Sequence, residues 1–335
     1  MRVGLLWLGG LLVVGALCAA SSARAVRSTD RSCSGTPAAY AFQTVDAPGH
    51  VDTGLHGVNH RGAVAGYFDD GAQAGGTAYP TGFVLRRGKI RPVRWAPDIY
   101  SDLNDINDAG DAVGYYGHVG RIANSGFLYE SRSNSHIPLV FPATVRTTIA
   151  AGINDHGTIA GTLNLDQTGL PQNADHKGYV KDRDQVSVPA YQLVSYPGAP
   201  ETFANGINDA GTVVGNYHAR RGDVTSSRSF VRTRGWYSTV DLHRLCAARS
   251  EAWGVNDRGE VVGFYTDAAG AVHGYVVRRG SISRVDVPET HTTQLYSITN
   301  QGVLYGTYDD ARGVSHGFIA TPSRRRHVSD TASAS

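Results

Sequence analysis

The segment Gly206-Ile207-Asn208-Asp209-Ala210-Gly211, followed by the Val-rich residues 212–217, decides the fold of this chain. Asn and Asp start tight turns through side-chain hydrogen bonds, and Gly supplies a positive φ, so the segment predicts a β-hairpin. The pattern occurs six times in 335 residues, at steps of 48, 47, 54, 48 and 43 residues. The other copies are Gly57-Val58-Asn59-His60-Arg61-Gly62, Asp105-Ile106-Asn107-Asp108-Ala109-Gly110, Gly152-Ile153-Asn154-Asp155-His156-Gly157, Gly254-Val255-Asn256-Asp257-Arg258-Gly259 and the degenerate Ser297-Ile298-Thr299-Asn300-Gln301-Gly302.

Each unit reads as four short strands. The second strand carries an interior Gly in every copy, which predicts that another group packs very close to it. The third strand opens with a small residue and an aromatic, as at Gly274-Tyr275. We predict that the fourth strand stops at a proline, because proline cannot donate to a β-ladder. These prolines are Pro97, Pro142, Pro197 and Pro288.

Four strands in about 48 residues, repeated, predict an all-β protein: a six-bladed β-propeller of four-stranded blades. The sixth unit lacks its fourth strand, whereas residues 41–48 resemble residues 282–288, the fourth strand of unit five. We therefore expect residues 41–47 to lie beside residues 316–321, so that the N-terminal strand pairs with the last blade and closes the ring. An open solenoid is the alternative.

The ends of the chain predict export. Met1 and Arg2 precede an apolar run over residues 3–20 and an Ala-x-Ala site ending at Ala25. This is typical of a signal peptide (1–25), with an uncleaved anchor as the alternative. We then expect an N-terminal arm (26–39), the propeller (40–322) and a disordered basic tail (323–335). The mature chain is expected to be a soluble monomer, secreted or periplasmic, with no membrane association.

Charge and cysteine content narrow the classes of partner. The 31 basic residues face 29 acidic ones, and the signal peptide contains two of the former. The mature net charge is near zero, so nothing favours nucleic acid as a partner. Cys33 and Cys246 remain after cleavage; in an oxidising compartment they can form a disulfide, and two buried free thiols are the alternative.

The repeat resembles the HAF-repeat family of probable extracellular bacterial proteins. That family combines Gly-Ile-Asn-x-x-Gly-x-Val-x-Gly with a later His-(Ala/Gly)-Phe and a proline-bearing strand. The tripeptide is clearest at His273-Gly274-Tyr275 and His316-Gly317-Phe318, whereas Thr81, Ser125, Lys177 and Arg228 stand in the His column of the other units. The resemblance implies export and a structural or binding repeat, and it offers no activity.

Motifs of catalysis and metal binding are missing from the sequence. Each Asn-Asp-x-Gly quartet supplies about one carboxylate, fewer than a calcium loop needs, and hairpin chemistry accounts for these residues. The 13 His lack zinc-site spacing. We therefore predict no cofactor, no metal and no catalytic residue. The alternative is a hydrolase or lyase, which predicts two or more carboxylates, or an acid with Tyr and Arg, converging within about 10 Å at one mouth of the channel. Such a convergence would count against the prediction of a non-enzyme.

One column of the repeat varies far more than its neighbours. Two residues before the Val/Ile marker stand His56, Asn104, Ala151, Asn205, Trp253 and Tyr296. Because the first strand of a blade is innermost, this column is expected near the central channel. Its five members larger than Ala151 are the predicted ligand-binding residues. Drift at partly exposed positions is the alternative. The function expected is a non-enzymatic binding module for a glycan, peptide or protein, and a purely structural envelope protein is a third interpretation.

Overall fold

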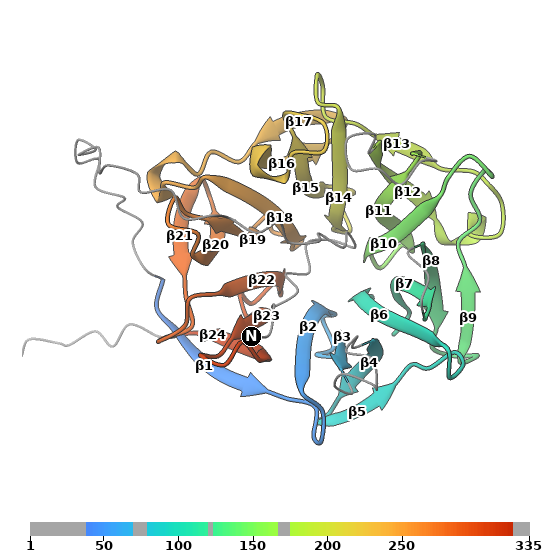
Figure 1. Cartoon of the computed structure of the whole chain (residues 1–335), viewed down its shortest axis with the longest axis horizontal. Coiled ribbons are helices and arrows are strands. Elements are labelled where there is room, and N and C mark those ends of the chain that lie inside the picture. Colours follow the sequence, from blue (N-terminus) through green and yellow to red (C-terminus); the bar gives the residue numbers. More distant parts are fainter. Residues whose placement is uncertain (1–37, 70–78, 120–122, 167–174, 324–335) are drawn as a thin grey trace, which may run out of the picture.

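The structure is a computed structural model that describes residues 38–69, 79–119, 123–166 and 175–323. Within these residues, six four-stranded antiparallel sheets stand around a central axis (Figure 1). The chain is therefore a six-bladed β-propeller, as the repeat predicts. The proposed signal peptide, most of the arm and all but the first residue of the tail lie outside the described residues.

The strands follow the repeat in chain order. Blade 1 contains β2 (Asp52–Val58), β3 (Val64–Asp69), β4 (Pro80–Arg86) and β5 (Lys89–Pro92). Blade 2 contains β6 (Ile99–Ile106), β7 (Ala112–His118), β8 (Asn124–Glu130) and β9 (Ser135–Pro138). Blade 3 contains β10 (Thr147–Ile153), β11 (Thr158–Asn164), β12 (His176–Asp182) and β13 (Gln192–Val194).

Blades 4 and 5 repeat this order. Blade 4 contains β14 (Glu201–Ile207), β15 (Val213–His218), β16 (Ser227–Thr233) and β17 (Trp236–Thr239). Blade 5 contains β18 (Arg249–Val255), β19 (Val261–Thr266), β20 (Val272–Arg278) and β21 (Ser281–Val285). Short 3-10 turns in the connections are η2 (Arg183–Gln185), η3 (Val224–Ser226) and η4 (His243–Leu245).

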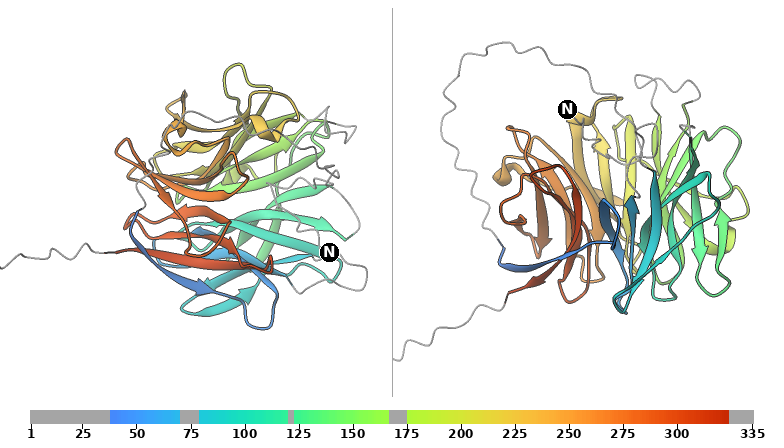
Figure 2. Two further views of the ribbon diagram at one scale, coloured as in Figure 1. Left: turned by 60° about the vertical axis from the view of Figure 1, so that its left-hand side comes forward. Right: turned by 60° about the horizontal axis from the view of Figure 1, so that its bottom comes forward.

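Blade 6 joins the two ends of the chain. It contains β22 (Thr293–Ile298), β23 (Leu304–Asp309) and β24 (Ser315–Pro322), with β1 (Tyr40–Val45) as its fourth strand. β1 pairs antiparallel with β24, from Tyr40 opposite Pro322 to Val45 opposite Gly317. Figure 2 shows β1, in blue, next to the red strand β24. The predicted closure is confirmed.

The glycine in each second strand faces a carbonyl oxygen of the first strand. A Cβ on Gly215 would overlap the oxygen of Phe203, and a Cβ on Gly114 would overlap that of Asp102. The other four blades repeat this contact at Gly66, Gly161, Gly263 and Gly306. The close approach predicted from the sequence is confirmed, and its cause is a β-bulge in the neighbouring first strand.

The blades pack through the aromatic residue of each third strand. Phe83, Phe127, Tyr179, Phe230, Tyr275 and Phe318 are all fully buried. The small residue before each aromatic lets the next blade approach: Gly82 faces Leu103, and Gly317 faces Leu55. The fourth strands, however, end three to five residues before Pro97, Pro142, Pro197 and Pro288. Those prolines lie in the connections that lead the chain inward to the next blade.

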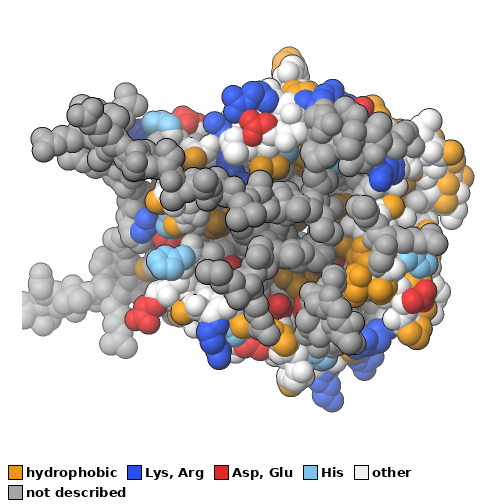
Figure 3. Space-filling model, viewed as in Figure 1, with side chains coloured by type: hydrophobic (Ala, Val, Ile, Leu, Met, Phe, Trp, Pro, Cys, Tyr) orange, Lys and Arg blue, Asp and Glu red, His pale blue; other side chains and the backbone are white. Residues whose placement is uncertain are grey.

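The surface is mixed in charge. On the face seen in Figure 3, Lys and Arg side chains lie around the edge with acidic, His and apolar side chains among them. No helix formed by the described residues has the length and apolar character that a bilayer crossing needs.

Candidate functional site

The six innermost strands surround a narrow central channel. Each carries a β-bulge, and the extra residue is the member of the varied column, as shown by the register shift between Leu55 and Gly57 around His56. His56, Asn104, Ala151, Asn205, Trp253 and Tyr296 all line one cavity of about 80 Å³. All five predicted binding residues therefore meet in the channel. The cavity has room for a few water molecules, and it is smaller than usual sites for organic ligands.

Two of the five predicted residues link adjacent blades. The amide nitrogen of Asn104 donates to the carbonyl of Ala150 at 2.9 Å, and that of Asn205 donates to the carbonyl of Ala252 at 3.0 Å. The amide nitrogens of both residues therefore already donate hydrogen bonds within the fold. They form part of the channel wall.

The other three predicted residues pack against one another. The rings of His56 and Tyr296 lie 4.5 Å apart, and those of Tyr296 and Trp253 lie 5.0 Å apart. His56 Nδ1 also lies 3.4 Å from Asp102 Oδ1, but the two atoms do not form a hydrogen bond. The three rings fill one side of the channel.

The Asn of each quartet has a second function that the sequence did not reveal. Asn154 Oδ1 accepts the backbone N–H of Thr158 and closes its own hairpin, while Nδ2 donates to the carbonyl of Asn208 in the next blade at 3.0 Å. The same bond to the next blade is made by Asn59, Asn107, Asn208 and Asn256. The Asn at this position therefore stabilises its own hairpin and also links its blade to the next one.

The next residue of each quartet forms a second ring, which we call the mouth ring: His60, Asp108, Asp155, Asp209, Asp257 and Asn300. In five of the six members, all but Asn300, the backbone N–H donates to the Oδ1 atom of the member in the following blade, at 2.7–3.1 Å. The last step is closed by side chains, with Asn300 Nδ2 lying 2.9 Å from His60 Nε2. Four carboxylates thus converge at one end of the channel.

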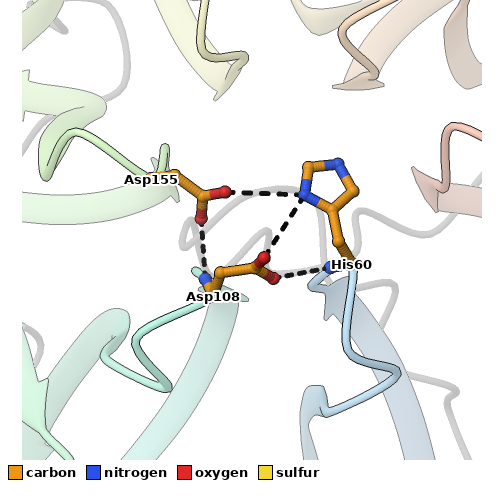
Figure 4. Close-up of side chains that lie close together, drawn as sticks. All are labelled: His60, Asp108 and Asp155. Atoms are coloured by element: carbon orange, nitrogen blue, oxygen red, sulfur yellow. Dashed lines mark hydrogen bonds and ion pairs between the residues drawn. The ribbon is translucent and has the colours of Figure 1, made fainter.

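The imidazole of His60 lies among these carboxylates (Figure 4). Its Nδ1 is 3.7 Å from Asp108 Oδ2 and 3.5 Å from Asp155 Oδ2, and its Nε2 is 3.1 Å from Asp257 Oδ2. Asp108, Asp155 and Asp257 therefore use their two oxygens differently: Oδ1 of Asp108, Asp155 and Asp257 accepts the N–H of the preceding blade, and Oδ2 lies near the imidazole. In the sequence, His stands at position 60 where four other units have Asp, but the residues that contact it lie 48 or more positions away.

Two carboxyl groups of the channel have shifted pKa values of opposite sign. Burial alone would raise the pKa of Asp257, but hydrogen bonds from Asn300 and the Asp209 N–H, together with His60, hold it below its usual range. Asp105 stands deeper, where other blades have Gly or Ser, and burial raises its pKa to about 7. This rise occurs although the N–H groups of Ile106 and Ile153 both donate to Asp105 at 2.9 Å.

One group of described residues could hold a metal ion. His60, Asp108 and Asp155 each offer a ligand atom, and these atoms lie within 4.8 Å of one another. Imidazole with two carboxylates is a donor set for a divalent transition ion. Such an ion would bind an unprotonated nitrogen of the His60 imidazole, so metal binding would compete with protonation of that ring.

A separate buried cluster lies where β14 begins. Glu201 accepts a hydrogen bond from Nδ1 of His176 at 2.7 Å and from Nδ1 of His218 at 3.0 Å, and all three side chains are buried. The N–H of Gly222 also donates to Glu201. Burial opposes ionisation, but these hydrogen bonds prevail and lower the pKa of Glu201 to about 2. The cluster ties blade 3 to blade 4.

The His of the HAF-like tripeptide has a structural environment. His316 Nδ1 lies 3.0 Å from Asp46 Oδ1, and its Nε2 lies 3.7 Å from Asp310 Oδ2. In blade 5, His273 bridges Asp286 and Asp267 in the same way. Cys246 is disulfide-bonded, and its predicted partner Cys33 lies outside the described residues.

No family model matches the chain, and the search of curated proteins found no match. Solved structures do resemble it. The β-propeller domain of the Trilobed protease from Pyrococcus furiosus has a TM-score of 0.45 at 10% identity, over 82% of this chain and 95% of that one. A Trypanosoma rangeli sialidase reaches 0.49 at 9% identity, over 81% of this chain and 54% of the sialidase chain. TolB from Acinetobacter baumannii reaches 0.48 at 9% identity, over 77% and 63%. At these identities the likenesses concern the fold alone.

Proposed function

We propose that this chain is an exported, non-enzymatic binding module that takes a cationic group of a peptide or protein, such as a lysine side chain, at the mouth ring. The observation that carries the proposal is the convergence of four carboxylates at the mouth, three of which have Oδ2 atoms 3.1–3.7 Å from the imidazole nitrogens of His60. Those are ion-pair distances for an N–H cation. The apolar run and Ala-x-Ala site of residues 1–25, and the resemblance to HAF repeats, support export.

The small volume of the cavity suits the tip of a single side chain. A cavity of about 80 Å³ is small beside usual ligand sites, which favours the tip of a side chain over a whole sugar ring or peptide. An extended alkyl chain ending in an ammonium group presents a narrow, singly charged tip, and the body of the partner would rest on the hairpins outside. The ligand class is therefore set by charge and width.

Binding of matched peptides to the full chain tests the proposal. Calorimetry would compare Ac-Gly-Lys-Gly-NH2 with the norleucine peptide, which has an uncharged side chain of similar length. We expect binding of the lysine peptide only. Asp155→Asn and Asp209→Asn should weaken it about threefold or more, the range of an exposed ion pair. The fold should tolerate both, because Asn300 already accepts the same backbone N–H in blade 6.

An exposed carboxylate outside the channel supplies the control. Asp184→Asn in η2 changes the net charge equally and should leave binding unchanged. Equal binding of the lysine and norleucine peptides would contradict the proposal, as would normal binding by Asp155→Asn. Zinc or calcium ions bound more tightly than the peptide would indicate a metal site instead.

A hydrolase or lyase is the second candidate, because the convergence of carboxylates that it predicts does occur. The mouth ring nevertheless suits acid catalysis poorly. Each of its carboxylates accepts a backbone N–H, which favours the ionised form. Asp105 has the pKa of about 7 that a general acid needs, but it lies inside the narrow cavity and accepts two backbone N–H groups. Turnover of a peptide or glycan that Asp105→Asn abolishes would favour this candidate.

A further inference from the structure

We propose that the imidazole of His60 is an internal competitor at the mouth ring: the cationic group of a ligand binds by displacing it, and His60 therefore sets the affinity and the ligand preference. The inference rests on the proposed function. It begins from the position of the ring, which lies within 3.7 Å of carboxylate oxygens from blades 2, 3 and 5. The imidazole thus stands where the proposed ligand would place its own nitrogen.

The contacts of Nε2 give the side chain two alternative partners. Asn300 Nδ2, 2.9 Å away, can only donate to it, so that bond requires an unprotonated Nε2. Asp257 Oδ2, 3.1 Å away, can only accept, so that contact requires Nε2–H. An imidazolium is thus attracted by Asp257, Asp155 and Asp108. A neutral imidazole that accepts the Asn300 hydrogen bond lacks this charge attraction to the carboxylates. The neutral form is the one that a ligand displaces easily.

The backbone contribution of His60 survives that displacement. Its N–H donates to Asp108 Oδ1 at 2.9 Å, as the N–H groups of the four Asp members donate to the next blade. The side chain of His60 is 38% exposed, more than those of Asp108, Asp155 and Asp257. The ring of backbone bonds can therefore stay intact while the imidazole swings outward. The repeat supplies an internal comparison, because four blades have Asp here and only blade 1 has a side chain able to carry positive charge.

Other charged groups surround the imidazole. Asp108, Asp155 and Asp257 face it directly, Arg61 lies beside Asp108 with Nε 3.8 Å from Oδ2, and Asp105 lies deeper in the cavity, where burial raises its pKa to about 7. The ionisation of Asp105 by itself changes cation affinity with pH, so affinities are compared at one pH and Asp105→Asn is measured beside the His60 variant.

His60→Gln removes the imidazole and keeps a polar side chain, and Asp105→Asn removes the carboxyl group with the raised pKa. The probe is n-butylammonium, the side-chain analogue of lysine, titrated by NMR into the full chain at pH 5.5. His60→Gln should bind it at least fivefold more tightly than the wild type. Asp105→Asn should not reproduce that gain.

The outcomes separate this inference from the proposed function. If n-butylammonium binds to His60→Gln with the affinity of the wild type, His60 is no competitor and the inference is wrong, whereas the mouth ring remains a cation site. If it binds to neither protein, both are wrong. His60→Asn, the residue of blade 6, replaces His60→Gln if the latter unfolds. Far-UV circular dichroism and urea unfolding confirm that each variant is folded.

Discussion

The bonds of Asn154 give the most direct test of how the ring is held together. Its Oδ1 accepts the Thr158 N–H at 2.8 Å within its own hairpin, and its Nδ2 donates to the Asn208 carbonyl at 3.0 Å in blade 4. Asn154→Ala removes both bonds and leaves the Thr158 N–H without its acceptor. With about 1 kcal/mol for each bond and a further 1–2 kcal/mol for the unpaired donor, we expect a loss of about 3 kcal/mol.

Asn154→Thr separates the two bonds, because the chain already contains this solution. In blade 6, Thr299 Oγ1 accepts the Val303 N–H at 3.1 Å and has no amide to offer the next blade. The variant should therefore keep the hairpin bond, lose only the bond to blade 4 and cost about 1 kcal/mol.

Urea unfolding followed by both tryptophan fluorescence and circular dichroism measures these differences, provided that the two signals change together. A loss below about 0.5 kcal/mol for Asn154→Ala would refute the account of the Asn column. Equal losses for the two variants would show instead that the hairpin bond contributes nothing separable.

Three further predictions concern closure, acid stability and the bulge. His316→Asn should make β1 more susceptible to limited proteolysis, because it weakens the contact between β24 and the end of β1. His273→Asn removes the equivalent contacts within a continuous part of the chain and should not have this effect. Equal resistance of the two variants to proteolysis would contradict a role of His316 in closing the ring. Glu201 has a folded pKa of about 2 against about 4.5 unfolded, so its stabilisation is present above pH 4.5 and lost as the pH falls towards 2. That is on the order of 3 kcal/mol, and Glu201→Gln should abolish this part of the acid sensitivity in urea titrations at pH 7 and pH 3. Gly215→Ala should cost about 3 kcal/mol, because the added methyl group meets the Phe203 carbonyl. Gly313→Ala is the control: only its positive φ of 76° is strained, so it should cost roughly 1 kcal/mol. A cost for Gly215→Ala no larger than that of Gly313→Ala would disprove the steric reason.

Local rules in the sequence were enough for most of the architecture. The Asn-Asp-x-Gly quartets predicted the hairpins, the small-aromatic pairs predicted the third strands, and the likeness of residues 41–48 to residues 282–288 predicted the closure. The fourth strands were predicted to end at prolines such as Pro142 and Pro288, but they end several residues earlier. A proline shows only that the β-ladder cannot continue through it; the ladder can end before it.

The candidate site was only half visible. The variation at His56, Trp253 and Tyr296 did indicate the channel, since these residues form the bulges that line it. The mouth ring was missed, because each Asp looked sufficient for its own turn. The replacement at His60 was the one signal available, and it had no meaning until the six turns were placed in a circle.

The sequence by itself determined the number of blades, their strands and their closure, because turns, alternation and packing residues act over distances shorter than one repeat. The tertiary structure alone decided which atoms meet on the axis. Each bond of the mouth ring joins residues 43 to 54 positions apart along the chain, apart from the closing contact between His60 and Asn300, which spans 240. Such partners are fixed by the angle between neighbouring blades, which no single repeat encodes.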